Sequence, residues 1–190
     1  MYQLLTAAIL SFLIAFTHFT SSFALVNQIQ NPLDDAHGLI HSVNSTGTTV
    51  PGSSPVRYGR DPLHNLFTIS QLDMHPNPCV IESYCSITAL GNFTADVASA
   101  HLSFKVVTRF DDGREGLMCG EDNFCKWVEV VQNGTKRCPP EKGHARLQWT
   151  VMLVGGWIPE ANYTITVLVT TPEGETVSDL WTEFEMRYKD

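Results

Sequence analysis

The sequence lacks the motifs that carry catalysis. It has no Gly-x-Ser-x-Gly nucleophile elbow, no His-Glu-x-x-His, no phosphate-binding glycine loop and no Gly-x-Gly-x-x-Gly turn. Asp111 and Asp112 precede Gly113, and paired carboxylates there are typical of a turn. Four histidines of the predicted domain have no second ligand at metal spacing: His64, His75, His101 and His144. We therefore expect no enzyme, no cofactor and no metal site.

Basic residues are scarce, with 12 Lys and Arg against 20 Asp and Glu, so the net charge is -8. The acidic excess lies beyond residue 60, because Asp34 and Asp35 balance Arg57 and Arg60 before it. Nucleic acids are polyanions, and this balance excludes them as partners. Strong attraction to anionic membranes is disfavoured too, so membrane contact should be transient or driven by apolar side chains.

Charge is absent from residues 1–24. This segment has an apolar core from Leu4 to Phe16 and ends in the small-residue sequence 22–24 (Ser-Phe-Ala), as signal peptides do. A membrane anchor needs about 20 apolar residues, and polar residues interrupt this run. The pattern predicts a cleaved signal peptide and a protein that is secreted or delivered to the lumen of a vacuole or lysosome.

Periodicity is absent from residues 25–61, which are rich in Asn, Ser, Thr, Gly and Pro. We interpret them as a flexible leader outside the fold, before a domain at residues 62–190. A cleaved pro-segment is the alternative, although no dibasic site is present.

The cysteine spacing does not match the two-residue gap of redox or zinc motifs. Cys79 and Cys85 form the plainest local pair, and Cys138 has two possible partners, Cys119 or Cys125, one of which stays free. These five cysteines and the sequons favour an oxidising compartment. The sequons begin at Asn44, Asn92, Asn133 and Asn162.

A long amphipathic helix is also missing, and short apolar-alternating segments between turn residues predict an all-β protein. Seven antiparallel strands favour an immunoglobulin-like sandwich, with a closed barrel as the alternative. The predicted strands span residues 66–74, 84–93, 100–110, 124–131, 145–154, 162–171 and 176–188.

The strands at 145–154 and 162–171 carry apolar side chains at every second position, which predicts one buried face for each. A glycan on Asn162 would point to solvent and send Tyr163 inward. The side chains expected between two sheets are Phe104, Val106, Phe110, Leu147, Trp149, Val151, Tyr163, Ile165 and Val167. Periodicity alone favours a filled core here, since every sandwich needs such residues.

From Leu66 to Met186 the sequence resembles the ML domain, the lipid-recognition family that includes fungal phosphatidylglycerol/phosphatidylinositol transfer proteins and a secreted sterol carrier. The resemblance rests on the order of four segments: 69–78 (ISQLDMHPNP), 86–97 (SITALGNFTADV), Cys138-Pro139 with Lys142-Gly143, and Ile158-Pro159 before 163–165 (Tyr-Thr-Ile). Family members have sandwiches whose sheets separate to admit a lipid, so the resemblance implies that the inward side chains line a cavity.

The chain departs from the family at two positions. Members usually carry a cysteine before the first strand and another near the start of the last. Here the matching segments read Leu-His-Asn at 63–65 and Thr-Val-Ser at 176–178. The bridge that closes the two ends is therefore absent, and such a bridge can contribute about 2 to 4 kcal/mol.

The resemblance implies a monomeric lipid carrier that moves a sterol or a phospholipid, such as phosphatidylglycerol or phosphatidylinositol, between membranes and serves intracellular sterol transport. In this interpretation Tyr163 is a candidate hydrogen-bond donor to the ligand. The alternative is a secreted immunoglobulin-like interaction module with a solid core, which would recognise a protein through the loop from Asp111 to Asn123.

Overall fold

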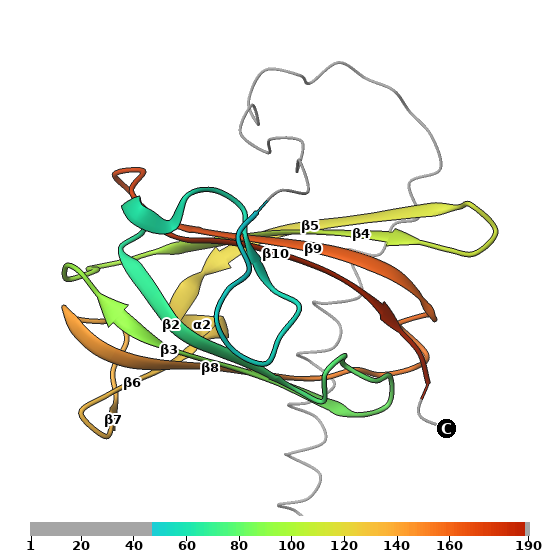
Figure 1. The fold of residues 1–190 in the computed structure, drawn as a ribbon, viewed down its shortest axis with the longest axis horizontal. Helices are drawn as coiled ribbons and strands as arrows, with labels where there is room; N and C mark the ends of the chain where they lie inside the picture. Colours follow the sequence, from blue (N-terminus) through green and yellow to red (C-terminus); the bar gives the residue numbers. More distant parts are fainter. Residues whose placement is uncertain (1–46, 189–190) are drawn as a thin grey trace, which may run out of the picture. The chain divides into compact units, whose positions relative to one another are not determined.

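The computed structural model describes residues 47–188, in which two five-stranded antiparallel sheets lie face to face (Figure 1). This confirms the all-β sandwich. The predicted signal peptide, residues 25–46 of the predicted leader and the Asn44 sequon lie outside the described residues. None of the helices among residues 47–188 has the length and apolarity needed to cross a membrane.

The first sheet has the strand order β1-β10-β9-β4-β5. Its strands are β1 (Arg57–Tyr58), β4 (His101–Arg109), β5 (Glu115–Asn123), β9 (Ala161–Thr170) and β10 (Thr176–Met186). The second sheet has the order β2-β3-β8-β6-β7. Its strands are β2 (Phe67–His75), β3 (Tyr84–Phe93), β6 (Glu129–Gln132), β7 (Thr135–Lys136) and β8 (Gly143–Met152). Two short helices, η2 (Pro62–His64) and α2 (Phe124–Trp127), lie between strands.

Period-two alternation determines which faces meet. On β9, Asn162 is exposed whereas Tyr163 is buried, as the sequon predicted. Fully buried apolar side chains from both sheets form one core, among them Phe67 and Phe93, whose ring centroids lie 4.6 Å apart. The predicted inward faces of β8 and β9 are therefore confirmed.

The prediction of a loop from Asp111 to Asn123 is wrong, because residues 115–123 form strand β5. This segment contains two glycines and three acidic residues, and its composition disfavours a strand. It forms one because it pairs along its whole length with β4 at the border of the sheet, where charge and glycine are tolerated.

The predicted strand at 124–131 is wrong in its first half. The Asn123 side chain accepts a hydrogen bond of 2.9 Å from the backbone N–H of Cys125, which caps a helical turn, α2. The chain uses this turn to pass from β5 in the first sheet to β6 in the second.

The leader prediction is wrong for residues 47–60, which we call the strap. Val50, Val56 and Tyr58 of the strap are buried. Strand β1 within it pairs with β10, and its Pro51 and Ser53 carbonyls accept hydrogen bonds from the N–H groups of β2. The strap thus joins the edges of the two sheets along one side of the sandwich (Figure 1).

The strap also accounts for Trp181, an apolar residue on the outward face of β10. Its ring is buried, although it alternates with inward residues. Arg57 lies 5.7 Å from the ring centroid, and a Cβ atom on Gly47 would stand only 2.9 Å from the indole Nε1. The strap therefore covers an apolar side chain that would otherwise face water.

Candidate functional site

Strands β4 and β9 bring four predicted site residues together on the inner face of the first sheet. Phe104 lies opposite Val167, and Val106 lies opposite Ile165. In an antiparallel pair, opposite residues point to the same face. Leu180 and Thr182 of β10 extend this face across the next strand.

Strand β8 places three predicted residues on the inner face of the second sheet. Leu147 lies opposite Ala89, Trp149 opposite Ile87, and Val151 opposite Cys85. Ile87 was absent from the predicted set, although it stands at the right parity between two buried residues of β3. The alternation in the 84–93 segment was the signal that could have found it.

Burial along these strands is uneven. On β9, Tyr163 and Val169 are buried, whereas Ile165 and Val167 between them are only half-buried. Strand β9 has a neighbour on each side, so the remaining exposure of these two side chains opens toward the facing sheet. Eight of the nine predicted residues are half-buried: Phe104, Val106, Phe110, Leu147, Trp149, Val151, Ile165 and Val167.

The two ends of the sandwich differ from this middle band. Phe67, Phe93 and Ala145 close one end, and Ile81 and Met186 are buried at the other. Side chains in a filled sandwich would be most buried in the middle. The inward side chains of the middle band are therefore less buried than those at the two ends.

The rings of Phe104 and Phe110 have different surroundings. A Cβ atom on Gly120 would stand 2.6 Å from Cζ of Phe104, so the ring lies across this glycine on the edge strand β5. Phe110 lies in the turn after β4, where its N–H and carbonyl bond to the turn backbone. The guanidinium of Arg114 stands 5.1 Å from its ring centroid.

The expected role of Tyr163 as a hydrogen-bond donor to a ligand is not supported. Its hydroxyl donates to the Pro159 carbonyl at 2.7 Å, and the residue is only 5% exposed. Burial raises the pKa of Tyr163, so the hydroxyl keeps its proton at neutral pH. Tyr163 closes one end of the apolar band and anchors the loop before β9.

The cysteines form two bridges, Cys79–Cys85 and Cys125–Cys138, and Cys119 is free and exposed. The local pair was predicted, and the structure resolves the choice for Cys138 in favour of Cys125. Cys119 lies opposite Lys105 on β5 and β4, on the outward face. The bridge at Cys138 ties α2 to the segment between β7 and β8.

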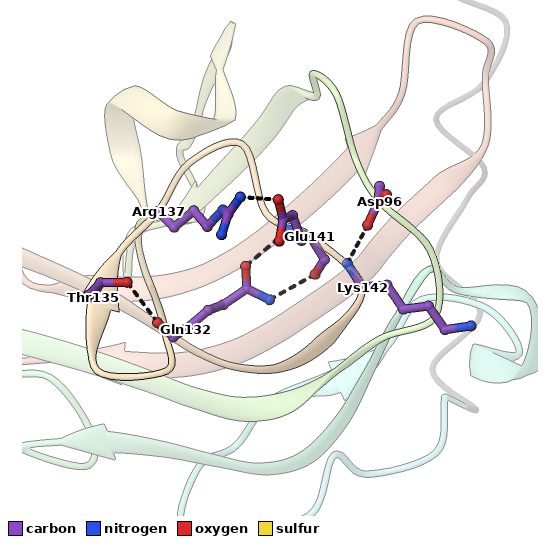
Figure 2. Close-up of polar contacts among 6 residues, drawn as sticks. All are labelled: Asp96, Gln132, Thr135, Arg137, Glu141 and Lys142. Carbon is purple, nitrogen blue, oxygen red and sulfur yellow. Dashed lines mark hydrogen bonds and ion pairs between the residues drawn. The ribbon is translucent and has the colours of Figure 1, made fainter.

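A polar network holds that same segment (Figure 2). The buried Gln132 amide accepts from the Glu141 N–H at 2.9 Å and donates to the Glu141 carbonyl at 2.7 Å. The Glu141 carboxylate pairs with Arg137, and the Lys142 N–H donates to Asp96 at 2.7 Å. The segment from Arg137 to Lys142 is therefore fixed by side chains as well as by the bridge.

Glycosylation stays a prediction. Asn133 and Asn162 are exposed, and Asn92 is half-buried, with its amide 3.2 Å from the Phe93 carbonyl. Among residues 47–188 no group of three or more His, Cys, Asp or Glu is arranged to hold a metal ion.

These features define a class of protein, an antiparallel β-sandwich with an apolar band between its sheets. Residues 53–179 match the sequence model of the ML domain, and the chain belongs to the ML-domain family. This is a family of lipid-binding proteins without enzymatic activity, which confirms the family resemblance and the expectation that the chain is not an enzyme.

Two fungal proteins are similar to this chain. A phosphatidylglycerol/phosphatidylinositol transfer protein of Aspergillus fumigatus is 30% identical over 132 residues, which cover 69% of this chain and 71% of that protein. A protein of the same name from Aspergillus oryzae is 27% identical over 139 residues, covering 73% of this chain and 75% of its own. A solved Niemann-Pick type C2 protein from the Japanese carpenter ant is 10% identical with a TM-score of 0.42, covering 67% of this chain and 97% of its own.

Proposed function

We propose that this protein is a lipid carrier that holds one hydrophobic ligand between its sheets and moves it between membranes. The observation that carries the proposal is the half-buried state of inward apolar side chains on interior strands, with buried ends on either side. Burying an acyl chain or a ring system against these side chains stabilises the complex by roughly 25 cal/mol per Å² of apolar surface removed from water.

Phospholipids are the ligand class that the proposal favours, because the similar Aspergillus proteins are named for transfer of phosphatidylglycerol and phosphatidylinositol. A sterol is the second candidate, since an apolar band selects by shape. The two disulfides agree with passage through the secretory pathway. We propose secretion or delivery to a vacuole or lysosome, action as a monomer and transient membrane contact.

The experiment is lipid analysis of protein purified from its own secretory route. We expect one phospholipid or sterol per chain by mass spectrometry, and binding of the matching fluorescent lipid after delipidation. A protein that carries no extractable lipid and binds neither a fluorescent sterol nor a fluorescent phospholipid would contradict the proposal. It would favour the alternative, a solid-core interaction module.

A further inference from the structure

One side of the sandwich is less enclosed than the other. Strand β5 borders the first sheet and pairs only with β4 among the described strands. On the second sheet, β6 pairs with β8 from Arg146 to Gln148, and no described strand pairs with residues 149–152 of β8 on that same side. The strap joins the two sheet edges on the opposite side. A ligand therefore has its easiest approach to the inner faces beside β5.

A row of four side chains crosses the inner face of the first sheet from β5 toward the strap. Met118 of β5 lies opposite Val106 of β4. Val106 lies opposite Ile165 of β9, which in turn lies opposite Thr182 of β10. Opposite residues of an antiparallel pair point to the same face, so the whole row faces the second sheet. Neighbouring strands lie about 4.8 Å apart, so the row spans about 14 Å.

Burial increases along this row. Met118 is 49% exposed, Val106 and Ile165 are half-buried, and Thr182 is 7% exposed. The three outer members are apolar, and the fourth carries a hydroxyl. The row thus leads from solvent, over apolar side chains, to a buried polar group.

The Thr182 hydroxyl is buried and makes no hydrogen bond to any group among the described residues. A hydroxyl can donate one hydrogen bond and accept two, and burying it without a partner costs free energy that a valine of the same shape would avoid. The other described residues with such an unpartnered side-chain atom are Ser54 in the strap, Asn65 before β2 and the outward-facing Trp181. Thr182 is therefore the one of these four that faces the apolar band.

The side chains beside Thr182 do not satisfy its hydroxyl. Leu180 and Phe184, its neighbours on the same face of β10, have no polar side-chain atom. Tyr163, which lies opposite Phe184, directs its hydroxyl to the Pro159 carbonyl. The row contains no charged side chain, so a phosphate would lose its hydration there without gaining a cation. An uncharged oxygen is the group that the Thr182 hydroxyl suits.

We propose that the Thr182 hydroxyl forms a hydrogen bond with an uncharged oxygen of the bound lipid, a sterol hydroxyl or an ester carbonyl, and so helps to select the ligand. The inference rests on the proposed carrier function and adds a specificity-determining residue to it. A lipid that lies along the row from β5 brings its leading end to Thr182, where its oxygen gives the buried hydroxyl a partner. An analogue without that oxygen leaves the hydroxyl unpartnered and binds more weakly.

The test uses two matched pairs of lipids with the full chain. Cholesterol is compared with cholestane, which lacks the hydroxyl, and diacyl phosphatidylglycerol is compared with its dialkyl ether analogue, which lacks the ester carbonyls. Each competitor displaces a bound reporter, either a fluorescent sterol or a fluorescent phosphatidylglycerol. We expect the unaltered protein to favour the oxygen-bearing member of one pair by about three- to tenfold, as one hydrogen bond gives. The pair that responds identifies the source of the oxygen.

Three variants separate the hydroxyl from the shape of the side chain. Thr182→Val should bind both members of the responding pair equally, and Thr182→Ser, which keeps a hydroxyl, should retain the preference. Thr166→Val is the matched control, since Thr166 lies on the outward face of β9, opposite Trp181, and it should also retain the preference. Thermal unfolding should find Thr182→Val at least as stable as the unaltered protein, because no hydrogen bond within the chain is lost.

The outcomes distinguish the role of Thr182 from the carrier function. An unaltered protein that binds lipid without a preference in either pair, or a preference that survives in Thr182→Val, overturns the role of Thr182 and leaves the carrier function standing. A clear loss of stability in Thr182→Val shows that the hydroxyl has a partner within the chain and overturns it too. Failure of the unaltered protein to bind either reporter contradicts the carrier function itself.

Discussion

At the scale of single residues, Trp149 distinguishes a cavity from a filled core. The substitution Trp149→Ala should weaken lipid binding with a loss of less than about 2 kcal/mol in the free energy of unfolding, because the side chain is only half-buried. In a filled core the same change would cost about 3 to 5 kcal/mol. Trp181→Ala is the matched control: it removes a buried indole from the outward face and should lower stability while sparing lipid binding. Denaturant unfolding and a lipid-binding titration measure both effects.

Gln132 is the residue on which the network in Figure 2 depends. Gln132→Leu removes both hydrogen bonds to the Glu141 backbone, and we expect a loss of about 1 to 3 kcal/mol in the free energy of unfolding. Gln148→Leu is the control. It makes the same amide-to-leucine change on the neighbouring strand β8, where the side chain is only half-buried, and should cost less. Equal stability of the two variants in urea would show that the network does not hold the segment.

At the scale of elements, the strap can be weakened at its C-terminal end. Arg60 pairs with the nearly buried Asp179 of β10 at 2.5 Å. Arg60→Ala should cost about 1 to 2 kcal/mol, since it leaves a buried carboxylate without its cation, and the partial exposure of Arg60 limits the loss. Arg57→Ala removes only the cation above the Trp181 ring and should cost less than about 1 kcal/mol. Thermal unfolding of both variants that gives the opposite order would contradict this view of the strap.

Sequence patterns predicted the strands well where the alternation of a strand's own side chains sets its bounds and its inner face. Strand β3 has the predicted bounds, and the alternation in β8 and β9 identified their inner faces. Strand β5 and the strap escaped prediction because their residues favour loops. They are ordered by backbone pairing with other strands, β5 with the preceding strand β4 and the strap with the edges of both sheets. The role expected for the Tyr163 hydroxyl was not supported because a local acceptor, the Pro159 carbonyl, satisfies it.

At the scale of the whole molecule, the number of free thiols tests the disulfide pairing directly. All five cysteines lie in the described residues, and two bridges leave Cys119 alone with a free thiol. A thiol reagent should therefore modify one cysteine per native chain, and still one after unfolding without reductant. Peptide mapping should find the label at Cys119, and Cys119→Ser should abolish labelling. Two or more labelled sites in the unfolded chain would contradict the pairing.

The strap has a further consequence for the limits of the domain. The family match runs from residue 53 to residue 179. A fragment cut there would lose Gly47 and Val50 at one end and would end β10 after Asp179, before its pairing with Arg57 and Tyr58. The region that identifies the chain as a family member is thus shorter than the region that folds. A stable fragment for expression should begin no later than Gly47 and extend at least to Tyr188, because the N–H of the buried Ile81 bonds to the Arg187 carbonyl and Ile81 pairs with Tyr188.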